Sequence, residues 1–168
     1  KVDPESGKKK PVYRWNYEPL TEKVYEAHLN GKLSIGIQPC NEDAEARLGV
    51  IDVDPQDYDD FNKKFFIDII QDYDLPLIPI ESKSGGLHLC LFMDQFTDAK
   101  AVKSFLTNLL PLFKLKPSNE IFPKQTELTR DEETEKLKPG QFINLPYYGG
   151  KRRALNVDGT PFELDKFL

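Results

Sequence analysis

The stretch GVIDVDP, Gly49 to Pro55, decides the fold, because it joins a buried strand to a pair of carboxylates. Side chains alternate across a strand, so Asp52 and Asp54 are expected on one face and the intervening isoleucine and valine on the other. Two close carboxylates repel each other, and a hard divalent cation such as Mg²⁺ or Mn²⁺ would remove that conflict. The alternative is that both aspartates cap a turn before Pro55, and this short pattern alone leaves both interpretations open.

The pattern of apolar residues predicts helices and short strands on both sides of this stretch. We expect helices over residues 21–30, 59–73 and 98–110. We expect strands over residues 33–37, 50–54, 75–80, 87–92, 120–122, 142–145 and 153–155. The strand at 75–80 contains two prolines, which fits an edge position. This interleaving predicts an α/β or α+β fold, in which helices flank a sheet.

Composition predicts one domain over residues 11–168, after a flexible, lysine-rich tail at 1–10. The charged segment at about 127–140 has no apolar face and is expected to be an exposed insertion. The net charge of −5 argues against a dedicated nucleic-acid binder. No apolar run approaches the roughly 18 residues that span a bilayer, so we expect no membrane partner. Two cysteines favour a reducing, cytoplasmic location. The two cysteines and two histidines are, as a set, too far apart in the chain to predict a structural zinc site.

A second stretch whose residues could form part of a functional site is SKSGGLHLCLF, Ser82 to Phe92. Gly85 and Gly86 permit backbone conformations that let a ligand approach the main chain, and the amides of such a turn can receive phosphate oxygens. In the strand that follows, His88 falls on the face opposite to the leucines, where it could donate a hydrogen bond to a phosphate. A hairpin turn followed by a core histidine explains this fragment equally well.

A third element is NEIFPKQ, Asn119 to Gln125. Glu120 is expected to point away from the core-facing isoleucine and to offer a third carboxylate. Lys124 lies beyond a proline, where its ammonium group could pair with a phosphate. Taken alone, this fragment is better explained as the end of a surface strand with ordinary charges.

Together these elements resemble the catalytic domain of the archaeo-eukaryotic primase superfamily, the primase-polymerases. Asp52 and Asp54 match the D-x-D motif, Ser84 and His88 match the longer S-G-G-x-H form of the second motif, and Glu120 matches the single later carboxylate. The sequences of three segments most resemble the branch found in plasmids, phages and conflict systems. These segments are HLNGKLSIGIQP at 28–39, EIFPKQ at 120–125 and GQFINLPYYGG at 140–150. The resemblance runs from about residue 17 to 150.

The resemblance implies an RRM-like mixed sheet flanked by helices, and template-directed synthesis of DNA from (d)NTPs at a 3′-hydroxyl. It implies that Asp52, Asp54 and Glu120 are catalytic and hold two Mg²⁺ or Mn²⁺ ions. The residues implied to bind the nucleotide are Lys83, Ser84, Gly85, Gly86, His88 and Lys124. Charge alone makes Arg152 and Arg153 candidates for contact with DNA or nucleotide. The implied partners are single-stranded or primer–template DNA, dNTPs or NTPs, and a helicase or further domains of a larger replication protein, in a prokaryotic plasmid or phage context.

Two other function classes stay open at this point. One is a metal-dependent nuclease that uses the same carboxylates; a rolling-circle initiator is disfavoured, because His28 and His88 do not readily form its paired-histidine site. We expect His28 to be a packed histidine rather than a ligand. The other class is a non-catalytic module that binds nucleotide or DNA, although three carboxylates beside a phosphate-binding turn would repel an anion unless cations were present.

Overall fold

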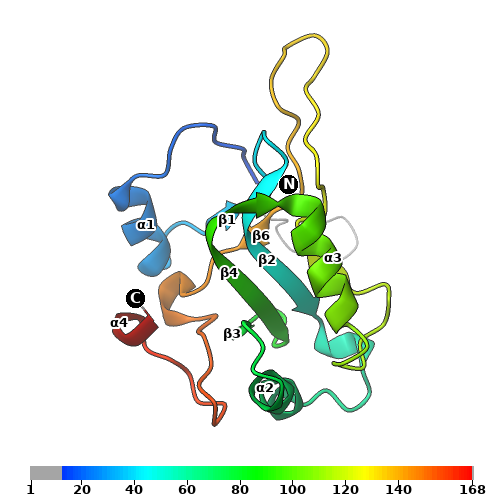
Figure 1. Ribbon diagram of the computed structural model, residues 1–168. Helices are drawn as coiled ribbons and strands as arrows, with labels where there is room; N and C mark the ends of the chain where they lie inside the picture. Colours follow the sequence, from blue (N-terminus) through cyan, green and yellow to red (C-terminus); the bar gives the residue numbers. More distant parts are fainter. Residues whose placement is uncertain (1–12, 168) are drawn as a thin grey trace, which may run out of the picture.

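The computed structural model describes residues 13–167, with the side chain of residue 167 excepted (Figure 1). The helices are α1 (Glu22–Leu29), α2 (Lys63–Asp72), α3 (Ala99–Leu109) and α4 (Leu164–Phe167), with short 3₁₀ turns η1 (Pro55–Asp57) and η2 (Tyr148–Gly150). The strands are β1 (Gly36–Ile37), β2 (Glu45–Val53), β3 (Ile78–Glu81), β4 (Leu87–Asp98), β5 (Glu120–Phe122) and β6 (Ile143–Asn144). The expected tail at 1–10 lies outside the described residues. None of the helices within 13–167 has the length and apolar character needed to cross a membrane.

The main sheet has four strands in the order β3-β4-β2-β5. Along the chain its elements run β2-α2-β3-β4-α3-β5, which is the βαββαβ arrangement of RRM-like and ferredoxin-like folds. The resemblance implied a mixed sheet, whereas every described strand pair is antiparallel. The reason is connectivity: β3 and β4 form a hairpin, and each helix crosses over to a strand that is not an immediate neighbour. The α/β class and the RRM-like core are confirmed.

One face of this sheet carries the main apolar core. Alternate residues of β2 and β4, such as Ile51 and Leu89, are fully buried against α2 and α3. Gly49 lets α3 approach closely, because a Cβ there would lie 2.8 Å from Leu106 Cδ1 and from Val102 Cγ1. The helices at 59–73 and 98–110 therefore form as expected, although α2 begins later, at a cap where the Asn62 side chain accepts a hydrogen bond from Lys64 N at 2.9 Å.

The opposite face of the main sheet is apolar at its middle, where β1 and β6 pair as a second, two-stranded sheet. The cluster on this face consists of Val50, Ile80, Cys90, Phe122, Ile143, Tyr147 and Ala154. His28 is buried between α1 and this region, where its Nδ1 accepts from Ile35 N at 3.0 Å and its Nε2 lies 2.8 Å from Pro146 O. The prediction of a packed histidine at that position is confirmed.

Several of the expected strands differ in extent from the structure: β1, β3 and β6 begin later than expected, and β4 continues to Asp98. Residues 153–155 do not form a strand: Ala154 makes only an isolated bridge to Ile80, and the next residue bridges Pro161. Strand β2 is longer than expected, beginning at Glu45, with an irregular register between Ala46 and Leu48. The charged segment at 127–140 is largely exposed and forms the long loop that projects from the sheets in Figure 1.

Candidate active site

A polar row crosses the main sheet at one level. In the register of the strands, Asp52 of β2 lies directly opposite His88 of β4 on one side and Glu120 of β5 on the other. Ile80 of β3 completes the row beside His88. Directly paired residues of antiparallel strands share a face and have Cα atoms only about 4.5–5.5 Å apart. Segments far apart in sequence are therefore brought to one point by strand pairing.

The members of this row differ in their access to solvent. The side chain of His88 is 10% exposed and that of Asp52 20%, whereas that of Glu120 is 55% exposed. The site is thus a partly buried carboxylate, with a buried imidazole on one side and an open carboxylate on the other. Beneath it, Asn119 Nδ2 donates to Asp52 O at 3.2 Å, and Tyr58 OH donates to Asn119 Oδ1 at 2.5 Å. These bonds tie the start of β5 to the end of β2.

The buried position of Asp52 makes its negative charge unfavourable. Burial is the main reason that its pKa is raised to about 7. The carboxylates of Asp54 and Glu120 raise this pKa further, while Lys124 acts in the opposite direction. The site therefore concentrates like charges that the protein itself only partly compensates, which is the environment that a bound cation would relieve.

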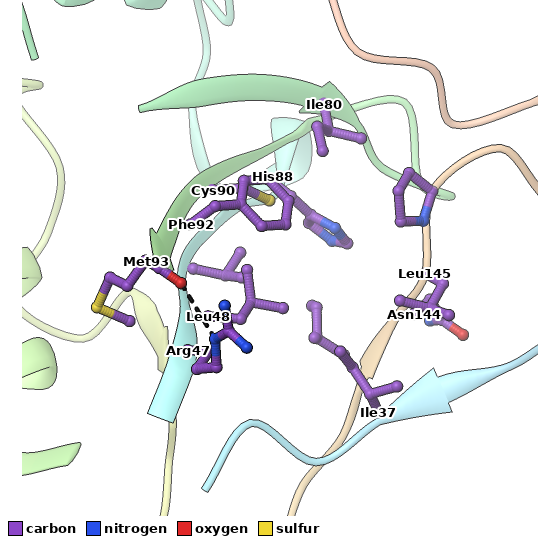
Figure 2. A pocket seen from close by; sticks show the side chains of 13 residues that line it. Ile37, Arg47, Leu48, Ile80, His88, Cys90, Phe92, Met93, Asn144 and Leu145 are labelled. Carbon is purple, nitrogen blue, oxygen red and sulfur yellow. Dashed lines mark hydrogen bonds between the residues drawn. The ribbon is translucent and has the colours of Figure 1, made fainter. Parts of the chain in front are cut away.

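His88 is uncharged at neutral pH. Burial lowers its pKa to about 4, and the positive charge of Arg152 lowers it further, while Asp54 acts in the opposite direction. Its Nε2 lies 3.5 Å from Asp52 Oδ1, so this contact is not an ion pair. Figure 2 shows the imidazole at one wall of a cavity of about 420 Å³ between β4 and the second sheet, with Ile37 and Leu145 opposite. A neutral ring here can donate one hydrogen bond and accept another.

The turn between β3 and β4 holds Asp54 through a chain of hydroxyl groups. Ser84 Oγ donates to Asp54 Oδ1 at 2.7 Å, and its single proton is thereby used. Ser82 Oγ, 2.8 Å from Ser84 Oγ, is therefore the donor of that second bond. Ser82 Oγ also accepts from Gly86 N at 3.1 Å, which closes the turn. Among the described residues, the amides of Lys83 and Ser84 donate to no acceptor and so stay available to a ligand.

The two glycines of this turn serve different purposes. Gly85 has φ +89°, a left-handed conformation that favours glycine, and the space around it is open. Gly86 is required by contact: a Cβ there would lie 2.0 Å from Val53 O and 2.8 Å from Pro55 Cδ. The turn can therefore pack against the end of β2, and this places Ser84 beside Asp54.

A basic pocket of about 460 Å³ opens beside the same turn. Among the residues that the structure describes, its charged lining residues are Lys63, Lys83, Lys151, Arg152, Arg153 and a single carboxylate, Glu81. Glu81 is neutralised by Lys63 at 2.9 Å, and Arg153 pairs with Glu163 at 2.8 Å outside the pocket. The remaining excess of positive charge, next to free amides, is suited to a polyanion such as a triphosphate.

Arg152 is the most unusual residue of this basic pocket. Its φ is +57°, which is rare for a residue with a side chain. Its guanidinium lies 5.1 Å from the centre of the Tyr148 ring, and its Nη1 is buried without a hydrogen-bond partner among the described residues. A strained, unsatisfied arginine beside a phosphate-sized pocket is the kind of feature that a bound anion would explain.

The carboxylates suit a hard divalent cation by their chemistry, but they do not yet surround a common point. Among residues 13–167, no three histidine, cysteine, aspartate or glutamate side chains form a metal-binding cluster. In this conformation Glu120 Oε1 accepts from Lys124 Nζ at 2.5 Å, and Asp54 accepts from Ser84. Glu120 is a cross-strand neighbour of Asp52, and its side chain is 55% exposed.

Most of the residues singled out from sequence lie around this one region. Lys124 lies on the far side of Asp52 from the basic pocket, bonded to Glu120, whereas Arg152 and Arg153 line the pocket beside Lys83. Sequence reasoning missed Ser82, Lys63, Tyr148 and Asn119. Ser82 had a usable signal, since it opens the same SKSGG turn that contains Ser84; the others depend on tertiary packing.

Comparison with known proteins identifies a family that covers most of the chain. Residues 3–157 match a protein family described as "TOTE conflict system, Archaeo-Eukaryotic Primase domain". This range includes every residue of the polar row, the serine turn and the basic pocket. The curated proteins include no match to the chain.

Proposed function

The chain belongs to the archaeo-eukaryotic primase domain family of TOTE conflict systems, and from this premise we propose that it is the catalytic core of a template-directed primase-polymerase. Family membership supports a primase-type nucleotidyl-transfer role. The finer proposal is transfer of nucleotides from (d)NTPs to the 3′-hydroxyl of a DNA primer on a single-stranded template. The observation that carries it is the pairing of His88, Asp52 and Glu120 across three adjacent strands beside a basic pocket.

The carboxylates are proposed to hold two divalent cations, Mg²⁺ or Mn²⁺. Asp52, Asp54 and Glu120 would provide the oxygen ligands, with Asp52 positioned by β2 and Glu120 exchanging its bond to Lys124 for a cation. When bound, the cations would activate the primer hydroxyl and stabilise the leaving pyrophosphate. Ser84 orients Asp54 by donating to Oδ1, which leaves Asp54 Oδ2 directed elsewhere for ligation.

The triphosphate is proposed to occupy the basic pocket at the serine turn. The amides of Lys83 and Ser84 and the open surface over Gly85 would receive phosphate oxygens. The buried Nη1 of Arg152 would gain the hydrogen-bond acceptor that it lacks. His88 would donate from a neutral imidazole, so this contact would persist across the physiological pH range. Phosphoryl transfer depends mainly on positioning and charge stabilisation, and these residues supply both.

The direct test is primer extension on a labelled primer–template, with dNTPs or NTPs and with Mg²⁺ or Mn²⁺. Asp52→Asn should lower the extension rate by about a hundredfold or more, because it removes a buried charged ligand while preserving shape. Asp60→Asn removes an exposed carboxylate near η1 and is the matched control, with unchanged extension expected. Full activity of Asp52→Asn, or shortening of the labelled strand without nucleotides, would contradict the proposal and favour a nuclease in the second case.

A second test separates nucleotide binding from chemistry. Arg152→Gln should weaken binding of a nucleoside triphosphate by about tenfold, since one charge-assisted contact in a partly buried site is lost. Arg130→Gln removes an arginine of the projecting loop, which lies outside the pocket lining, and serves as control. Equal affinities of the two variants would remove the basic pocket from the proposal.

A further inference from the structure

Three aromatic side chains gather on the small sheet, away from the polar row. Tyr13, Trp15 and Phe142 line a slot of about 240 Å³, which we call the aromatic slot. Its remaining lining residues are Arg14, Leu33, Ser34 and Gly36. Gly36 of β1 and Phe142, which directly precedes β6, line the slot, whereas Ile37 and Ile143 line the apolar cavity of Figure 2.

The rings of the aromatic slot are held in place but remain accessible. The centroid of Phe142 lies 5.0 Å from that of Tyr13 and 6.4 Å from that of Trp15, at tilted and edge-on angles. A Cβ at Gly36 would lie 2.2 Å from Phe142 Cδ2, so the glycine provides the space in which this ring is seated. Tyr13 is nevertheless 63% exposed and Trp15 41% exposed. A contiguous group of exposed aromatic rings is typical of a ligand-binding or interaction site.

The charge around the slot selects the kind of ligand. Arg14 is exposed within the lining, and among residues 13–167 the lining contains no carboxylate. Aromatic rings beside an arginine are the combination that binds single-stranded nucleic acids, since bases stack on the rings while the guanidinium meets a phosphate. A neutral apolar partner would have no use for the arginine. We propose that the aromatic slot binds an unpaired base of single-stranded nucleic acid, with Arg14 contacting an adjoining phosphate.

The slot and the basic pocket are linked through the segment that follows α1. Tyr148, which lines the basic pocket, donates a hydrogen bond from its hydroxyl to Gly31 O at 2.7 Å. Leu33 and Ser34, a few residues further along the chain, line the slot. A base stacked in the slot would belong to a strand led toward the polar row, as a template requires. This inference depends on the proposed function only for the choice of a nucleic-acid ligand.

The chain contains a single tryptophan, Trp15, so its fluorescence reports directly on the slot. We would titrate the full chain with an oligothymidylate, without nucleotides or divalent cations, and follow tryptophan emission. Stacking should quench the emission in a saturable way, and higher salt should weaken binding. Tyr13→Ala should bind about tenfold more weakly than the wild type. Tyr73→Ala, at a tyrosine that is 59% exposed at the end of α2, is the matched control and should bind like the wild type.

A second variant tests the role of charge. Arg14→Gln should retain quenching at low salt but lose about one unit of the slope of log affinity against log salt. Unquenched emission in the wild type, or equal affinities of Tyr13→Ala and Tyr73→Ala, would overturn the slot as a base-binding site. Thermal unfolding of each variant confirms that the comparison is made between folded proteins.

Primer extension on the same samples separates this inference from the proposed function. A wild-type chain that quenches with the oligonucleotide but does not extend primers would overturn the polymerase proposal and support the slot. A chain that extends primers but shows no quenching would overturn the slot and support the polymerase proposal. Asp52→Asn should retain quenching while losing extension, because Asp52 belongs to the polar row and not to the slot.

Discussion

The two faces of the main sheet are built from the same strands but have opposite effects on stability. On one face, residues such as Ile51 and Leu89 are fully buried under α2 and α3. On the other, their immediate neighbours Asp52 and His88 form part of a polar row with Glu120. Each buried leucine or isoleucine contributes about 1.5–3 kcal/mol, whereas the raised pKa of Asp52 shows that its charge costs free energy. Stability arises mainly on the helix face, and the opposite face holds an unfavourable cluster of charge.

The largest expected loss of stability comes from a substitution on the face of the main sheet that α2 and α3 cover, which we call the helix face. Leu106→Ala in α3 removes a side chain that has no solvent exposure and should lower the free energy of unfolding by about 3 kcal/mol. Phe105→Ala, at the exposed neighbouring position, should lower it by less than about 1 kcal/mol. Urea unfolding followed by circular dichroism measures both. Similar losses for the two variants would mean that α3 does not pack as described.

A smaller loss of stability is expected for substitutions in the turn between β3 and β4, beside the polar row. Gly86→Ala places a Cβ against Val53 O and should destabilise the protein by about 2 kcal/mol, while also weakening triphosphate binding. Gly85→Ala meets no atom within 4 Å, so its cost is limited to the left-handed backbone, about 1 kcal/mol. The same unfolding assay, with nucleotide titration, distinguishes the two. A Gly86→Ala protein as stable as the wild type would refute the close approach of the turn to β2.

Removing the charge of Asp52 from the polar row should increase the stability of the protein. The pKa of Asp52 rises from 3.8 in the unfolded chain to about 7 in the folded protein, so the folded state binds more protons between these values. Stability from this group is therefore lost as pH rises through about 7, and Asp52→Asn should abolish that loss. At pH 8 in EDTA the variant should be more stable than the wild type by about 2 kcal/mol, after allowance for solvent contact.

The stability difference between Asp52→Asn and the wild type should depend on pH and on added metal ions. At pH 4 the wild type and Asp52→Asn should unfold at nearly the same urea concentration, because the aspartate is then largely protonated in the folded state. Added Mn²⁺ at pH 8 should stabilise the wild type more than the variant. Asp60→Asn, an exposed control, should show no such pH-dependent gain. A variant less stable than the wild type at pH 8 would contradict the assignment of Asp52 as an unfavourable buried charge.

The smallest effect is expected at the exposed end of the serine turn. Ser84→Ala removes the donor to Asp54 but leaves an exposed site, so the free energy of unfolding should change by less than about 1 kcal/mol. Ser82→Ala should cost more, because Ser82 is buried and its hydroxyl accepts from Gly86 N. Equal effects of the two substitutions would contradict the order of the hydrogen-bonded chain.

Much of this architecture was predictable because alternation is a local property. The sequence of β2 and β4 shows which residues share a face, and the structure confirms that Asp52 and His88 lie opposite the leucines. Helix α3 was predicted to within a residue at each end, because Asp98 caps it and its apolar spacing is regular. The predicted strand at 153–155 was wrong, because an isolated bridge and a left-handed Arg152 depend on the packing of the neighbouring chain.

The sequence by itself determined the face to which Asp52 and Glu120 belong, since a period of two residues allows no other outcome within a strand. Asp54 lies after the end of β2, before η1, so its position depends on the turn. Only the tertiary structure decided the register, and with it that Glu120 and His88 both lie opposite Asp52. The tertiary structure also brought Arg152 to the serine turn and Tyr13 to Phe142. These pairs are distant in the chain, and their meeting depends on how strands align and helices pack, which no local pattern of residues encodes.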